Sequence, residues 1–148
     1  MKRLRSLLFG TSDVATDLGL LVLRVGIGLA MAFAHGLGKI PPSEGFINAT
    51  ANLGFPLPEL FAWAAALAEF GGGLLIAVGL LTRPAAAALA FTMAVAFFGA
   101  HGGDPFGERE LAFVFGIASV ALMISGAGRL SLDRLLAPPS SRRGTEAE

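Results

Sequence analysis

Five ionisable side chains lie in or at the ends of apolar stretches, and they are the residues of this sequence best placed to do chemistry. They are Arg24, His35, Lys39, Glu69 and His101. A charged residue at the centre of a membrane helix costs roughly 2.5–3.5 kcal/mol on insertion scales, so it is expected to face other helices and to have a partner. Carboxylate, imidazole and ammonium groups can exchange protons or bind a carbonyl-bearing ligand.

The first apolar stretch carries three of these residues with helical spacing. His35 and Lys39 are four residues apart and therefore share a helix face. Arg24 lies eleven residues before His35, close to three full turns, and falls on the same face. Glu69 lies near the middle of the second stretch. We predict a buried Arg24–Glu69 ion pair, in which Arg24 must stretch because the two estimated depths differ by ~9 Å.

The outer ends of the helices are predicted to form a polar mouth. His101 ends the third apolar stretch and Glu110 opens the fourth. We expect these two residues, with His35 and Lys39, to ring the mouth, while Glu69 lies beneath it. Each of these residues also has a purely structural interpretation. Lys39, for example, can extend its ammonium group to the membrane–water interface. Glu110 can interact favourably with the helix dipole from the first turn of its helix.

Three kinds of site are compatible with this set. The first is a pocket for a quinone or another polar-headed aromatic molecule. The second is a metal site built from His35, His101 and either Glu69 or Glu110, which would suit Zn²⁺, Fe²⁺ or Cu²⁺. Two isolated histidines without a local motif are weak evidence for a metal site, so no metal is predicted. The evidence for a haem bound between the two histidines is equally weak. The third is a proton or solute path through the bundle.

The composition indicates a membrane protein with a single domain. Only 15% of the 148 residues are charged, against about 25% in soluble domains, and the mean hydropathy is +0.70. Eleven basic and eleven acidic residues balance, so nothing suggests a nucleic-acid partner. The chain has no cysteine, which excludes a disulfide, a persulfide intermediate and a thiolate metal site.

The apolar stretches predict an all-α fold, a bundle of four transmembrane helices within a domain of residues 18–136. The predicted helices are 18–38, 60–81, 84–100 and 111–128. Each approaches the roughly 17–25 residues that span a bilayer. Their many small residues allow helices to approach closely within one bundle, and could also pair two copies as a homo-oligomer.

The remaining segments predict the topology. Residues 1–17 form a basic amphipathic segment, the loop 40–59 contains a short helix capped by Ser43, and residues 137–148 form a disordered tail. With both termini in the cytoplasm, the inside collects eight Lys and Arg residues, including Arg83, and the outside only two. This bias predicts cytoplasmic termini.

Five segments, in order, resemble the DoxX family of small four-helix bacterial membrane proteins. They are LRVGIGLAMAFAHGLGK (23–39), LGFPLP (53–58), AEFGGGLLIAVGLLTRPAA (68–86), MAVAF (93–97) and GAGRLSLD (126–133). The resemblance implies a multi-pass protein of the bacterial inner membrane linked to redox metabolism, because members are associated with thiosulfate:quinone oxidoreduction, quinone or catechol stress and oxidant defence. The recurring polar positions of the family correspond to Arg24, His35, Lys39, Glu69 and Arg83.

These observations lead to one functional prediction and two alternatives. We expect a redox-associated membrane subunit that binds a quinone-like molecule around Glu69, His35 and Lys39, with contributions from Arg24 and His101. Glu69 and His35 are the expected catalytic residues. A soluble or membrane partner must supply electrons, because the chain has no redox-active group of its own. The alternatives are a small-solute transport protein and a scaffold subunit of an oxidoreductase complex.

Overall fold

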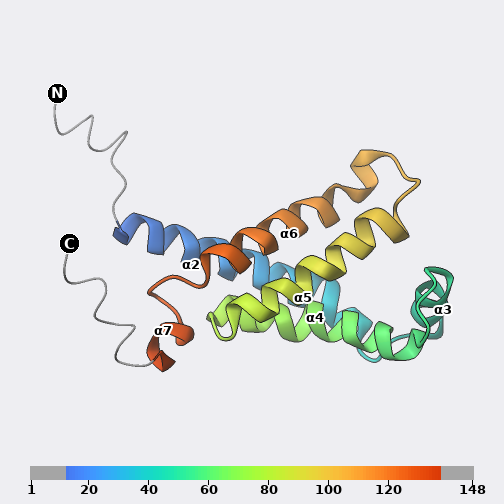
Figure 1. Cartoon of the computed structure of the whole chain (residues 1–148), viewed down its shortest axis with the longest axis horizontal. Coiled ribbons are helices and arrows are strands. Elements are labelled where there is room, and N and C mark those ends of the chain that lie inside the picture. The colour runs from blue at the N-terminus through green and yellow to red at the C-terminus, as the bar shows by residue number, and fades with distance from the viewer. Residues whose placement is uncertain (1–12, 138–148) are drawn as a thin grey trace.

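The computed structural model describes residues 13–137, which are helical throughout with connecting loops and contain no strand (Figure 1). The elements, in chain order, are α2 (Asp13–Ala30), η1 (Met31–Gly36), η2 (Leu37–Lys39), α3 (Glu44–Asn52), α4 (Pro58–Val78), α5 (Thr82–Ala94), η3 (Val95–Ala100), α6 (Phe106–Ser125) and α7 (Leu132–Leu136). The segments η1 and η3 are π-helical and η2 is a 3₁₀-helix. The predicted all-helical fold class is therefore confirmed.

Three helical runs are long and apolar enough to cross a membrane. They are Asp13–Lys39 with 27 residues, Pro58–Val78 with 21 and Thr82–Ala100 with 19. The helix α6 is 20 residues long, but Glu108, Arg109 and Glu110 lie in its first two turns and shorten its apolar part. Three of the four predicted membrane helices thus meet the requirement for a membrane span by length and composition.

Several helices begin earlier than the apolar stretches suggest. The first run starts at Asp13, so residues 13–17 of the predicted amphipathic segment belong to it. The rest of that segment, and the predicted tail from residue 138, lie outside the described residues. The helix α5 starts at Thr82, with Pro84 in its first turn, where proline is tolerated. Polar residues lengthen these helices at their ends, where hydropathy gives no signal.

The loop between the first run and α4 folds back as the short helix α3. The Ser43 side chain accepts a hydrogen bond from the backbone N–H of Phe46 at 3.3 Å and so caps the first turn. Figure 1 shows α3 at the end of the molecule opposite α7. It packs against α4.

The first helical run and α4 approach each other at glycines. A Cβ atom added to Gly73 would lie 2.8 Å from the carbonyl oxygen of Gly28, and one added to Gly28 or Gly36 would overlap the α4 backbone. Only glycine allows this backbone contact. The contact fixes how far the two antiparallel helices are shifted along each other, and therefore which side chains meet.

The end of the bundle that carries the start of α2, the α4–α5 turn and α7 is joined by polar contacts; we call it the basic end (Figure 1). The Asp133 carboxylate accepts hydrogen bonds from the N–H groups of Leu81 at 2.7 Å and Thr82 at 3.0 Å, and so caps α5. Arg129 donates its backbone N–H to Asp17 at 2.8 Å. These contacts attach the segment after α6 to the end of the bundle at which α2 begins.

Substituting Gly28 with alanine should destabilise the protein, whereas the same change at Gly26 should not. The added methyl at Gly28 meets the backbone of Gly73 and Ala77, which no rotamer change can relieve, whereas nothing lies within 4 Å of the Gly26 position. Overpacking of this kind costs about 1–3 kcal/mol. Thermal unfolding of the purified variants in detergent measures the difference, and equal melting temperatures would contradict the proposed packing.

Candidate functional site

Arg24 is buried at the basic end, remote from the other predicted site residues. Its guanidinium donates to the carbonyl oxygen of Ala77 at 2.6 Å and to that of Leu130. The side chain is 2% exposed and thus serves the C-terminal end of α4, whose last carbonyls have no partner within the helix. The predicted Arg24–Glu69 ion pair is wrong. Arg24 bonds to the last turn of α4, about two turns after Glu69, and Glu69 has Lys39 as its partner.

Glu69 pairs instead with Lys39. The Lys39 Nζ lies 2.6 Å from one carboxylate oxygen and 2.7 Å from the other. The Glu69 side chain is 3% exposed, whereas that of Lys39 is 35% exposed. A carboxylate in the middle of a membrane helix is thereby neutralised by an ammonium that reaches in from a more open position. The Lys39 ammonium also lies 5.4 Å from the ring centre of Phe46.

The pairing follows from the register of the first run against α4. Gly36 lies against the backbone of Glu69 and Phe70, so Lys39, one turn later, is level with the middle of α4. Depth counted from the start of each apolar stretch placed Lys39 at an outer mouth. In the structure the partly exposed Lys39 side chain contacts the buried Glu69, and α3 packs against α4.

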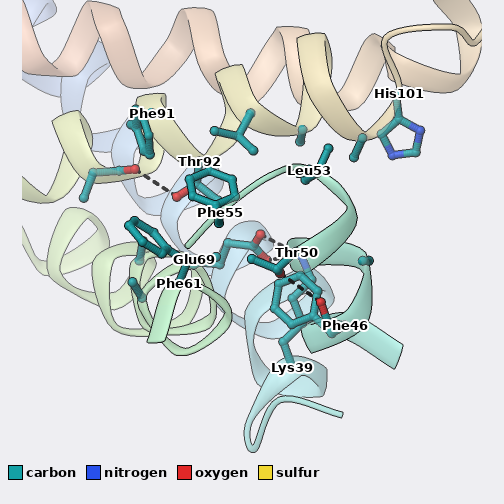
Figure 2. A pocket seen from close by; sticks show the side chains of 18 residues that line it. Lys39, Phe46, Thr50, Leu53, Phe55, Phe61, Glu69, Phe91, Thr92 and His101 are labelled. Atoms are coloured by element: carbon teal, nitrogen blue, oxygen red, sulfur yellow. Dashed lines mark hydrogen bonds and ion pairs between the residues drawn. The ribbon is translucent and has the colours of Figure 1, made fainter. Parts of the chain in front are cut away.

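A largely apolar pocket opens beside the ion pair; we call it the aromatic pocket (Figure 2). Its volume is about 360 Å³, within the range of small-molecule sites. The rings of Phe46, Phe55, Phe61 and Phe91 line it, together with alanines of α4 and α5. The rings of Phe55 and Phe61 pack with their centres 4.6 Å apart. The polar groups of this wall are few, and Lys39–Glu69 is the charged pair among them.

His101 lines one end of the aromatic pocket, as Figure 2 shows. Its Nδ1 lies 2.8 Å from an oxygen of Asp104, in the turn that follows η3. His101 and Glu69 thus lie on the same pocket without being bonded to each other. Within residues 13–137, no three His, Cys, Asp or Glu side chains gather closely enough to hold a metal ion.

His35 lies outside the aromatic pocket and lines a smaller neighbouring cavity instead. Its ring packs edge-on against Phe115, with ring centres 5.5 Å apart. Lys39, Glu69 and His101 line this cavity as well, so four of the five predicted site residues are brought together. The predicted Glu110 is not among the lining residues, and Glu108 takes its place, because α6 begins at Phe106 and a two-residue shift turns a helical side chain to another face.

Sequence reasoning missed the aromatic lining of the pocket. Phe46 and Phe55 lie in the loop region before α4, and Phe61 and Phe91 lie in apolar helices, where phenylalanine is unremarkable. Their spacing carries no signal because four separate elements supply them. The long proline-containing loop was the available hint, since loops of that length are often functional.

The fold and this site define a multi-helix membrane protein whose interior charges meet beside an apolar pocket. The DoxX family model matches residues 19–102. The chain is 34% identical to the "Putative oxidoreductase CatD" of Bacillus subtilis over 79% of this chain and 86% of that protein. It is 33% identical to the inner membrane protein YphA of Escherichia coli, over 90% and 99% of the two chains. It is 37% identical to the Escherichia coli inner membrane protein YqjF, over 81% and 93%.

The chain therefore belongs to the DoxX family and is a multi-pass protein of the bacterial inner membrane. No solved structure matches it significantly. The predicted membership of the DoxX family is thus confirmed. Two of the five segments that resemble the family supply the ion pair, since Lys39 ends the first and Glu69 lies in the third.

Replacing Lys39 alone should destabilise the protein more than replacing both members of the pair. Lys39→Met leaves the Glu69 carboxylate buried without a partner, which costs about 2 kcal/mol. Adding Glu69→Gln removes the uncompensated charge and should restore most of the loss. Melting temperatures of the two single variants and the double variant measure the coupling. Additive losses would show that the pair contributes no interaction energy.

Proposed function

We propose that this protein is a redox-associated membrane component that binds a quinone-like molecule in the aromatic pocket. The observation that carries the proposal is an aromatic pocket of about 360 Å³ whose wall contains one buried ion pair. Ligand sites of this kind combine a mostly apolar lining with a few polar groups that fix orientation. A flat ring with carbonyl oxygens matches both parts of the wall.

The apolar part of the wall suits the ring of such a ligand. Phenylalanine rings from α3, α4 and α5 surround the space, with small alanine side chains between them. Aromatic rings prefer offset or edge-on packing at centre distances of about 4.5–7 Å. The phenylalanines of the three helices can therefore pack against a flat ligand ring. A lipid-soluble ligand can also reach the pocket from the membrane, because Phe91 is 60% exposed on the α5 surface.

Lys39 is suited to bind a carbonyl oxygen of the ligand. An ammonium group has three N–H donors, and the two contacts to Glu69 leave one of them available. The side chain is 35% exposed, so a ligand in the pocket can reach it. We assign Lys39 the role of orienting the ligand head.

Glu69 is the proposed proton-transfer residue. Reduction of a quinone to a quinol takes up two electrons and two protons, and a carboxylate beside the carbonyl oxygen can pass protons to it. We propose that a partner redox protein supplies the electrons, because the chain has no cysteine thiol that could do so. His35, which is outside the pocket, is proposed to act on proton supply, and Arg24 is given no role in ligand binding.

We further propose that α6 is a fourth membrane helix and that both termini are cytoplasmic. The helix α6 packs along α5, and the chain that follows it bonds to the start of α5 and to α2, so α6 connects the two ends of the bundle. Leu111, Ile117 and Ile124 on α6 are each more than half exposed, which suits a lipid-facing surface. The arginines of the basic end then lie on the cytoplasmic side.

Quinone binding can be measured through Trp63, the one tryptophan of the chain. A short-chain benzoquinone should quench its fluorescence saturably in the purified protein. Phe61→Ala and Glu69→Gln should each weaken binding about tenfold, which corresponds to about 1.4 kcal/mol. The matched control is Phe98→Ala, because Phe98 is 75% exposed and does not line the pocket. Equal affinities in all four proteins would refute the proposed site.

The topology predicts opposite results for reporters placed at the two ends of α6. A green fluorescent protein fused to the C-terminus should fluoresce, because it folds in the cytoplasm. Alkaline phosphatase fused after Gly103, in the turn before α6, should be active, because that enzyme matures outside. A dark C-terminal fusion would mean that α6 does not cross the membrane.

A further inference from the structure

A second cavity adjoins the ion pair next to the aromatic pocket; we call it the polar cavity. Its volume is about 190 Å³, and it lies between η1, η3 and α6. The polar residues that line it are His35, Lys39, Glu69, His101 and Glu108. Lys39 and Glu69 line both spaces, so the ion pair forms part of a wall common to the two.

The polar cavity has the properties of a hydrated space. The His35 imidazole is half-buried in it and makes no hydrogen bond within residues 13–137, its ring contact being with Phe115. Because the ring nitrogens have no protein partner within these residues, water in the cavity is the partner that we expect for them. A cavity needs roughly 10–15 Å³ and two to four polar partners to hold one water, and this cavity provides for several.

Two π-helical segments border this cavity. Met31 and His35 belong to η1, Ala96 belongs to η3, and His101 follows η3 directly. A π-helical turn is rare and often marks a functional site, because its extra residue widens the helix and redirects side chains. Because both π-helical segments border the same cavity, we infer that they shape it.

We propose that the polar cavity is a water-filled route by which protons reach the Lys39–Glu69 pair from the end of the bundle that carries His101 and Glu108. This inference rests on the proposed function, because it supplies the protons that a bound quinone requires. The titratable groups along the route are His35 on η1, Lys39 on η2, Glu69 on α4, His101 with Asp104 after η3, and Glu108 on α6. In this proposal the ligand enters through the aromatic pocket and the protons arrive through the polar cavity.

Hydration of the cavity can be tested without any ligand, because the chain contains no cysteine and a single introduced thiol is unambiguous. Ala112 lines the polar cavity, whereas Val114, two residues further along α6, is 48% exposed on the outer surface. In lipid nanodiscs, Ala112→Cys should react with a charged thiosulfonate reagent at least about tenfold faster than Val114→Cys, because thiolates form in water and not in lipid. Equal rates would overturn the proposal.

Proton access can be tested by filling the cavity. Ala112→Phe should leave equilibrium quinone affinity unchanged, because Ala112 does not line the aromatic pocket, but should slow the change in Trp63 quenching after a pH jump about tenfold. Val114→Phe is the control with the same substitution on the outer face. Equal relaxation in the two variants, or a quinone affinity independent of pH, would refute the route. Failure of quinone binding in the wild-type protein would refute the proposed function alone, since the cysteine experiment still decides whether the cavity is hydrated.

Discussion

The contact between the first helical run and α4 is the constraint on which the rest of the structure depends. Gly28, Gly36 and Gly73 bring the two backbones together so closely that no side chain fits between them. In lipid, where the hydrophobic effect does not drive helices together, such packing holds a bundle and fixes its register. That register places Arg24 on the last turn of α4 and Lys39 beside Glu69, so two costly charges find partners through one interface.

Arg24, which is buried, and Lys39, which is partly exposed, are stabilised in different ways. Arg24 uses its fork of N–H groups to satisfy backbone carbonyls, a role that holds α4 and the segment after α6 together at the basic end. Lys39 offers a point charge to a carboxylate and keeps a donor for a further group. The first arrangement is closed and structural, whereas the second lies between two cavities and is open to chemistry.

The arrangement of the cavities gives the ion pair two distinct environments. The aromatic pocket is lined mainly by phenylalanines and alanines, the polar cavity has His35 and Glu108 in its lining, and His101 lines both. A group that lines both spaces can contact a lipid-soluble molecule and water at once. This separation connects the proposed ligand site with a proton supply, and it gives His35 a place beside the chemistry although it does not touch the ligand.

The sequence by itself determined the membrane location, the helical class, the family and most of the residues that gather inside, because hydropathy and the cost of buried charge are local properties. It also determined the short helix after Ser43, whose capping pattern is local. The tertiary structure alone decided that Glu69 pairs with Lys39 and not with Arg24, that Glu108 and not Glu110 faces the cavity, and that four phenylalanines line one pocket. The physical reason is register: the depth of a residue depends on where two helices touch, and backbone contact at glycines, which hydropathy does not record, sets that position.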